Sequence, residues 1–138
     1  MFFLTYGDAV SDVNIAELLS FHRRNEKMIT VTAVHPEGRF GEMRLMNGSV
    51  SGFEEKPCRV EGYINGGFMV LDKGFVPRYL SPDKDLFLEQ APMRQAMADG
   101  QMCAFAHEGF WQCMDTPREY QLLNDLWKTG RAPWVSAW

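Results

Sequence analysis

The chain has 138 residues, of which 46% are hydrophobic and 13% aromatic, and its formal net charge is -4. This length fits one domain with a modest core, and the apolar content excludes a disordered chain. The acidic excess argues against nucleic-acid binding, which needs a basic face. No apolar run approaches the roughly 20 residues that span a bilayer, and no basic leader is recognisable. We therefore expect a cytoplasmic protein without a membrane partner.

The cysteines favour a reducing compartment. Cys58, Cys103 and Cys113 are odd in number and form no C-x-x-C pair. With no metal spacing, they are expected to fill the core rather than to bind metal or form disulfides.

The first elements form a strand–helix–strand series. Residues 2–6 are apolar and indicate a buried strand, which begins so directly after Met1 that the start resembles the interior of a fold. Asn14 and Glu17 form a capping-box pattern that opens a helix. Residues 28–34 are rich in β-branched side chains and indicate a second strand. This order predicts parallel pairing of the two strands.

The middle of the chain has a sequence pattern typical of hairpins and turns. Residues 42–46 and 49–54 flank Asn47-Gly48, the strongest short signal for a β-hairpin. Asn65-Gly66-Gly67 then precedes a strand over residues 68–71, and its glycines indicate close approach to the backbone, by either a bend or a ligand. Residues 86–99 indicate a helix with Pro92 in its first turn.

The last third predicts two strands and a helix. Residues 101–107 and 109–114 indicate strands, and Thr116-Pro117-Arg118-Glu119 opens a helix that ends at Gly130. Trp134 and Trp138 suggest that the tail docks on its own core or on a neighbouring subunit. Together the elements predict an α/β fold with a mostly parallel sheet and an antiparallel hairpin region.

Two aspartates are the main candidates for chemistry. Asp8 and Asp115 each follow an apolar run, and strand ends are where open α/β sheets bind ligands. Converging carboxylates could hold a hard cation against a phosphate. The alternatives are a turn or cap role for Asp8 and a helix-capping role for Asp115. The residues alone leave both interpretations open.

Other polar residues are weaker candidates. Lys56 precedes Pro57 and suits phosphate binding as a point charge, although a solvated surface lysine is the alternative. The Asn65 amide can both donate and accept, which suits sugar hydroxyls. His22 lies on an apolar helix face and is expected to be a core histidine. The sequence has no G-x-S-x-G, no P-loop and no G-x-G-x-x-G motif.

An ordered series of short motifs resembles the sugar-nucleotidyltransferase family, and most closely its glucose-1-phosphate cytidylyltransferase branch. The series runs through Thr5-Tyr6-Gly7-Asp8, Ser11-Asp12-Val13-Asn14-Ile15, Gly38-Arg39-Phe40-Gly41, Phe53-Glu54-Glu55-Lys56-Pro57, Ile64-Asn65-Gly66-Gly67-Phe68 and Gly109-Phe110-Trp111-Gln112-Cys113-Met114-Asp115-Thr116. The resemblance covers essentially the whole chain. E-K-P alone is a weak signal, whereas the order of the series is a strong one.

The resemblance implies a Rossmann-like nucleotidyltransferase sheet and an enzyme that makes CDP-glucose and pyrophosphate from CTP and glucose 1-phosphate. It implies Mg²⁺ as the cofactor, a homo-oligomer, and a place in nucleotide-sugar supply for lipopolysaccharide O-antigen. By resemblance, catalysis would fall to Asp8, Lys56 and Asp115, with the metal held by Asp8 and Asp115. The substrate would be bound by Gly41, Glu55, Lys56, Asn65 and Trp111.

Two departures from the family pattern matter. Ala9 stands where the family usually has glycine, and the family's glycine-rich nucleotide loop has no counterpart here. The resemblance therefore implies that residues 1–138 are the C-terminal portion of a single nucleotidyltransferase domain, inactive in isolation, with apolar surface exposed around Phe2 and Leu4. The alternatives are a related enzyme using UTP or dTTP and a non-catalytic fragment that binds sugar phosphate or oligomerises.

Overall fold

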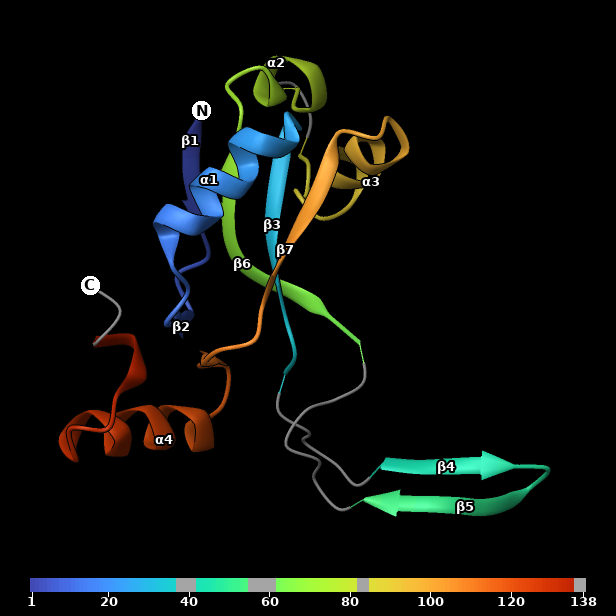
Figure 1. Cartoon of the computed structure of the whole chain (residues 1–138), viewed down its shortest axis with the longest axis vertical. Coiled ribbons are helices and arrows are strands. Elements are labelled where there is room, and N and C mark those ends of the chain that lie inside the picture. The colour runs from blue at the N-terminus through green and yellow to red at the C-terminus, as the bar shows by residue number, and fades with distance from the viewer. Residues whose placement is uncertain (37–41, 55–61, 82–84, 136–138) are drawn as a thin grey trace.

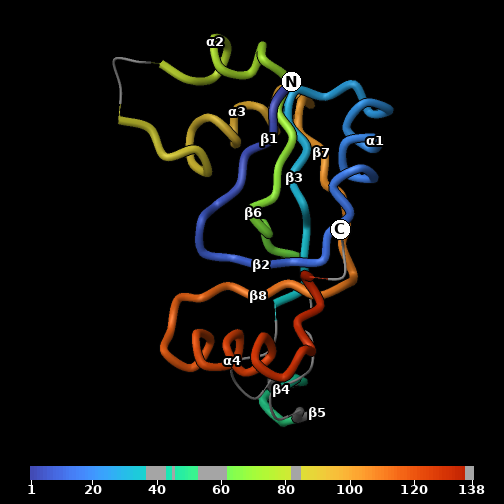
Figure 2. Tube along the Cα trace, turned by 90° about the vertical axis from the view of Figure 1, so that its left-hand side faces the viewer, coloured from blue at the N-terminus to red at the C-terminus, as the bar shows by residue number. Residues whose placement is uncertain are grey.

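A mixed four-stranded sheet forms the centre of the molecule. The computed structural model describes residues 1–36, 42–54, 62–81 and 85–135. The strands are β1 (Phe2–Thr5), β3 (Ile29–Val34), β6 (Ile64–Leu71) and β7 (Met102–His107), in the order β1-β6-β3-β7. β3 is parallel to β7, and β6 is antiparallel to both β1 and β3, so three strands run in one direction. Helices cover both faces (Figure 2), which confirms the predicted α/β class.

The first strand–helix–strand series has the predicted order but a different pairing. β1, α1 (Ile15–Asn25) and β3 follow one another, yet β6 lies between the two strands, so their predicted direct pairing was wrong. A helix about 10 Å wide covers about two strand spacings of 4.8 Å, which leaves room for one intervening strand. β6 fills that place after the chain returns from a distant hairpin.

α1 covers one face of the sheet, and its buried polar side chain, His22, has a hydrogen-bond partner. Its N-cap is Asn14, whose Oδ1 accepts the Glu17 backbone N–H at 3.0 Å. His22 lies inside, with Nδ1 2.8 Å from the Thr30 hydroxyl, and Cys103 Sγ lies 3.2 Å from the same hydroxyl. His22 is therefore the predicted core histidine, and Cys103 is a half-buried filler.

The opposite face carries the main apolar cluster. α2 (Phe75–Tyr79) and α3 (Ala91–Ala98) pack there, and Pro92 lies in the first turn of α3 as predicted. The cluster consists of Ile29, Val31, Met69, Leu71, Phe75, Tyr79, Met93 and Ala96. Because helices cover both faces, every residue of β3 is buried. Helix α2 was not predicted.

β1 differs from the buried strand expected from its sequence. Phe2 and Phe3 are 38% and 50% exposed. Among the described residues, β1 pairs only with β6, so its other edge lacks a neighbour in this part of the chain. The exposure agrees with the expectation of bare apolar surface around Phe2 and Leu4.

The predicted hairpin projects away from the sheet (Figure 1). β4 (Glu42–Met46) and β5 (Ser49–Glu54) pair antiparallel, and the turn residues Asn47 and Gly48 have φ angles of 51° and 82°. Positive φ at both positions is the geometry that Asn-Gly favours, so the hairpin prediction is confirmed.

A second two-stranded ribbon lies below the main sheet in the view of Figure 2. β2 (Ala9–Ser11) pairs antiparallel with β8 (Trp111–Cys113), and α4 (Pro117–Lys128) follows it. The final turn η1 (Pro133–Val135) places the Trp134 ring 5.5 Å from the Phe110 ring. The tail therefore docks on its own chain at Trp134, whereas Trp138 lies outside the described residues. In the described ranges, we find no helix with the length and apolar character needed to cross a membrane.

Candidate functional site

The β2–β8 ribbon brings the two candidate aspartates to the same end of the ribbon. Ala9 opposes Cys113, and the Met114 backbone N–H donates to the Asp8 carbonyl at 2.8 Å. Asp8 and Asp115 are both exposed there. The prediction that Asp115 ends a buried strand was wrong: only Gln112 of β8 is buried, because the chain turns after β7 and leaves the main sheet.

The helix cap beside Asp115 is made by other residues. Thr116 is the N-cap of α4, and its Oγ1 accepts the Glu119 backbone N–H at 3.3 Å. Glu119 Oε2 in return accepts the backbone N–H groups of Thr116 and Asp115, at 3.0 and 2.8 Å. The predicted capping box is thus present, and it uses Thr116 rather than the Asp115 carboxylate as the N-cap.

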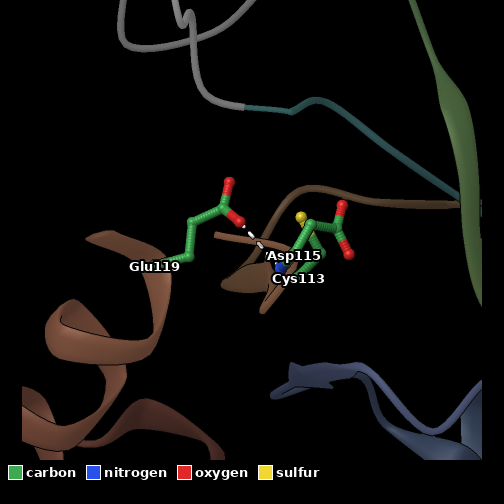
Figure 3. A group of neighbouring side chains, drawn as sticks. All are labelled: Cys113, Asp115 and Glu119. Atoms are coloured by element: carbon green, nitrogen blue, oxygen red, sulfur yellow. Dashed lines mark hydrogen bonds between the residues drawn. The ribbon is translucent and has the colours of Figure 1, made fainter. Parts of the chain in front are cut away.

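Three potential metal-ligating side chains gather at this end of β8. The ligand atoms of Cys113, Asp115 and Glu119 all lie within 4.8 Å of one another (Figure 3). Sequence reasoning missed this group because its spacing matches no common metal motif. A cysteine sulfur is too soft to suit Mg²⁺, and Glu119 is already engaged in the cap.

The glycine pair lies within β6, which begins earlier than the predicted strand over residues 68–71, and it forms a bulge. The β3–β6 register shifts between Val31 and Ala33, where Gly66 and Gly67 lie on the opposite strand. A Cβ on Gly66 would meet Val34 Cγ1 at 2.8 Å, and one on Gly67 would meet Tyr6 Cδ2 at 2.6 Å. The sequence predicted close approach to this backbone by either a bend or a ligand. The structure has a bend, in which the side chains of Val34 and Tyr6 are the nearest neighbours.

Trp111 and Asn65 are brought together at this bulge. The Trp111 indole N–H donates to the Gly66 carbonyl at 2.8 Å, so the β2–β8 ribbon is tied to β6. Asn65 is the residue before Gly66 and is half-buried. The Trp111 side chain therefore reaches the backbone of β6 at the residue that follows Asn65.

Tyr6 contacts this part of β6 and was not predicted as a site residue. Asn65 Nδ2 donates to the Tyr6 hydroxyl at 3.3 Å, and that hydroxyl donates to Glu89. Asn65 Oδ1 accepts the Gly67 backbone N–H at 3.0 Å. Burial, followed by the hydrogen bond to Glu89, raises the pKa of Tyr6 to about 12. The sequence carries no local signal for a contact between residues so far apart in the chain.

A histidine–aspartate pair fixes the start of β8. Asp12 Oδ1 lies 2.8 Å from His107 Nε2 and accepts the Phe110 backbone N–H at 2.7 Å. A Cβ on Gly109 would meet that Asp12 oxygen at 2.4 Å. The turn therefore needs glycine there, and it orients the strand that carries Trp111.

Gly41, Glu55 and Lys56 lie outside the described residues, as does Cys58. Their roles stay predictions from the resemblance.

Known structures and sequences place this arrangement in a defined class. A solved structure assigned as a glucose-1-phosphate thymidylyltransferase from Bacillus anthracis aligns with a TM-score of 0.62 at 19% identity, over 90% of this chain and 53% of that one. HddC from Yersinia pseudotuberculosis aligns with a TM-score of 0.61 at 17% identity, over 91% of this chain and 55% of that one. These similarities show that the chain shares the fold of these two proteins.

Comparison of the sequence with known proteins identifies the family. Residues 1–126 match the model described as nucleotidyl transferase, and the chain belongs to this family. The glucose-1-phosphate cytidylyltransferase of Salmonella typhi is 41% identical over 133 residues, which cover 96% of this chain and 51% of that protein. The mannose-1-phosphate guanylyltransferase catalytic subunit beta of Dictyostelium discoideum is 30% identical, over 86% of this chain and 34% of that protein. The chain thus spans about half the length, or less, of these relatives.

Proposed function

We propose that this chain carries the sugar-phosphate and metal side of a glucose-1-phosphate cytidylyltransferase. The observation that carries the proposal is the 41% identity to the Salmonella typhi enzyme over 96% of this chain. In this proposal the chain is the C-terminal portion of a nucleotidyltransferase domain, and the glycine-rich nucleotide loop belongs to an N-terminal portion. Its substrates are CTP and glucose 1-phosphate, and its products are CDP-glucose and pyrophosphate.

The reaction joins two polyanions. A phosphate oxygen of glucose 1-phosphate attacks the α-phosphorus of CTP, and the bond from that phosphorus to the bridging oxygen of the β-phosphate breaks as pyrophosphate leaves. Such phosphoryl-type transfers depend on alignment and on charge stabilisation rather than on a covalent nucleophile. The protein must therefore supply positive charge and hold the sugar phosphate in line.

Asp8 and Asp115 would hold Mg²⁺. Both carboxylates are exposed at the same end of the β2–β8 ribbon, and carboxylate oxygens are the donors that Mg²⁺ prefers. When bound, the ion would neutralise phosphate charge. The thiol of Cys113 does not fit such an ion, so the proposed donor pair excludes it.

The sugar phosphate would lie beside the bulge in β6. In this proposal Lys56 binds the phosphate as a point charge, Glu55 and Asn65 bind sugar hydroxyls, and Gly41 contributes a backbone contact. The Trp111 ring forms one wall of the sugar site. Support for this placement comes from the hydrogen bond between Trp111 and the Gly66 carbonyl, which brings the indole next to Asn65.

The biological setting follows from the proposed product. A CDP-sugar is an activated donor, so the enzyme would supply surface polysaccharide such as lipopolysaccharide O-antigen. We place it in the cytoplasm, where CTP is available, and expect a homo-oligomer.

A chimera tests the proposal directly. This chain replaces the 133 matching residues of the Salmonella typhi enzyme, and CDP-glucose is measured with CTP, glucose 1-phosphate and Mg²⁺. We expect turnover with CTP to exceed that with UTP or dTTP. Asp8→Asn and Asp115→Asn should each lower turnover by about 100-fold or more, since losing even an outer-shell partner of a metal costs about 10- to 100-fold.

Asp125→Asn is the matched control, because Asp125 lies exposed on α4 and accepts a hydrogen bond from Gln121 that an amide oxygen can also accept. A folded chimera without CDP-glucose formation would contradict the proposed reaction. Normal turnover in either site variant would remove that aspartate from the metal site.

A further inference from the structure

The Asn65 amide is held from both ends within the described part of the chain. Its Oδ1 accepts the Gly67 backbone N–H at 3.0 Å, and its Nδ2 donates to the Tyr6 hydroxyl at 3.3 Å. An asparagine amide has two N–H donors and two carbonyl lone pairs. These two bonds therefore leave one N–H and one lone pair for a ligand.

The direction of the hydrogen bonds depends on Glu89. A carboxylate only accepts, so the Tyr6 hydroxyl must donate its single proton to Glu89 and can only accept from Asn65. The charge on the acceptor makes this the stronger of the two bonds. Without Glu89 the hydroxyl could rotate, and the Gly67 N–H alone would then hold the orientation of the amide.

The Tyr6 ring is also fixed in place. It lies against Gly67, where a Cβ would come within 2.6 Å of Cδ2, and the Tyr6 backbone N–H donates to the Gly67 carbonyl at 3.3 Å. The Tyr6 phenol, whose pKa is raised to about 12, is protonated at neutral pH and can donate to Glu89. β1, the bulge of β6 and the segment before α3 meet in this contact.

We propose that Tyr6 and Glu89 are positioning residues that orient the Asn65 amide so that it presents one N–H and one carbonyl lone pair to neighbouring hydroxyls of a sugar. This inference rests on the proposed function for the identity of the ligand. The orientation of Asn65 itself does not depend on that function. Each sugar hydroxyl both donates and accepts, so a pair of them matches the donor and acceptor that remain.

The first experiment observes Asn65 directly in the ¹⁵N-labelled chain. We expect the two Nδ2 protons to be distinct, with the one bonded to Tyr6 exchanging slowly with water. Tyr6→Phe should remove that protection, and Glu89→Ala should broaden or shift the pair. Glu89→Gln keeps an acceptor for Tyr6 and should stay nearer to the wild type. Unchanged Asn65 resonances in both Tyr6→Phe and Glu89→Ala would overturn the proposal.

The second experiment uses the chimera described above and separates this inference from the proposed function. Tyr6→Phe should raise the KM for glucose 1-phosphate about 5- to 10-fold, the loss expected for one oriented hydrogen bond, and should leave the KM for CTP unchanged. Tyr120→Phe, at an exposed tyrosine of α4, is the control. An equal rise in both KM values would indicate a merely structural role and refute positioning. If the parent chimera makes no product, the proposed function fails while the resonances of Asn65 still decide the orientation.

Discussion

Replacing Gly67 by alanine should destabilise the fold more than an ordinary glycine substitution. Gly67 has a φ of 81°, and a Cβ there would come within 2.6 Å of Tyr6 Cδ2. The left-handed backbone costs an alanine about 1–2 kcal/mol, and overpacking costs about 1–3 kcal/mol more. Alanine also stiffens the unfolded chain, which offsets about 0.4–1 kcal/mol. The expected net loss in unfolding free energy is about 1–4.6 kcal/mol.

Two other glycines separate the contributions. Gly100 has a φ of 65° with open space at its Cβ position, so Gly100→Ala reports backbone strain alone. Gly66 lacks the left-handed φ but would place a Cβ 2.8 Å from Val34 Cγ1, so Gly66→Ala reports crowding alone. After the same offset, Gly100→Ala should cost about 0–1.6 kcal/mol and Gly66→Ala about 0–2.6 kcal/mol, each less than Gly67→Ala, which carries both contributions.

Urea unfolding followed by circular dichroism measures all three variants. The slope of free energy against urea should stay constant, so that midpoint shifts report stability. If Gly67→Ala costs no more than Gly100→Ala, the Tyr6 ring does not constrain the bulge and the crowding estimate is refuted.

Three further predictions concern the cap and two titrating groups. Thr116→Ala should lower the unfolding free energy by about 1 kcal/mol, measured by urea unfolding, because it removes the N-cap of α4. Between pH 10 and about 12 the unfolded chain loses the Tyr6 proton while the folded chain keeps it, so stability should fall as pH rises through this window. Tyr6→Phe should flatten that fall in urea midpoints. Burial lowers the pKa of His22 below 6.5, so the unfolded chain takes up this proton first and stability should decline as pH drops below 6.5. A His22→Gln variant that kept the full decline would exclude His22 as its source.

Local signals predicted the elements that depend on short-range contacts. The caps at Asn14 and Thr116 and the Asn47-Gly48 turn are all present. Each depends on hydrogen bonds or φ values within a few residues, so the sequence pattern contains the whole interaction.

The order of the strands could not be predicted in the same way. The position of β6 between β1 and β3 could not be read from the sequence. Strand pairing depends on contacts across long sequence separations, and the apolar patterns of these strands fit several neighbours. α2 was missed because its five residues are too few to show a helical period. The Phe2 and Phe3 side chains look like core residues in sequence, and only the position of β1 in the sheet explains their exposure.

The candidate site was predicted mainly through family resemblance. Asn65 and Trp111 were named on that basis. In the structure Asn65 lies at the β6 bulge, and the Trp111 indole of β8 donates to the carbonyl of the next residue, Gly66. The contact between Tyr6 and Glu89 was missed because they are 83 positions apart, and the motif Thr5-Tyr6-Gly7-Asp8 does not indicate a role for the Tyr6 hydroxyl. Contacts of this kind follow from the fold and leave no local trace in the sequence.

The register of the β2–β8 pair determines that Asp8 and Asp115 lie at the same end of the ribbon. Asp8 precedes β2 and Asp115 follows β8, so antiparallel pairing of Ala9 with Cys113 puts them at one end. The register is fixed at the other end of the ribbon, where Asp12 binds the Phe110 N–H at 2.7 Å and Ser11 Oγ donates to the Phe110 carbonyl at 2.8 Å. A slip of one residue would turn each β8 side chain to the opposite face. Asp12 therefore supports the proposed metal site structurally, at a distance from the carboxylates that would hold the ion.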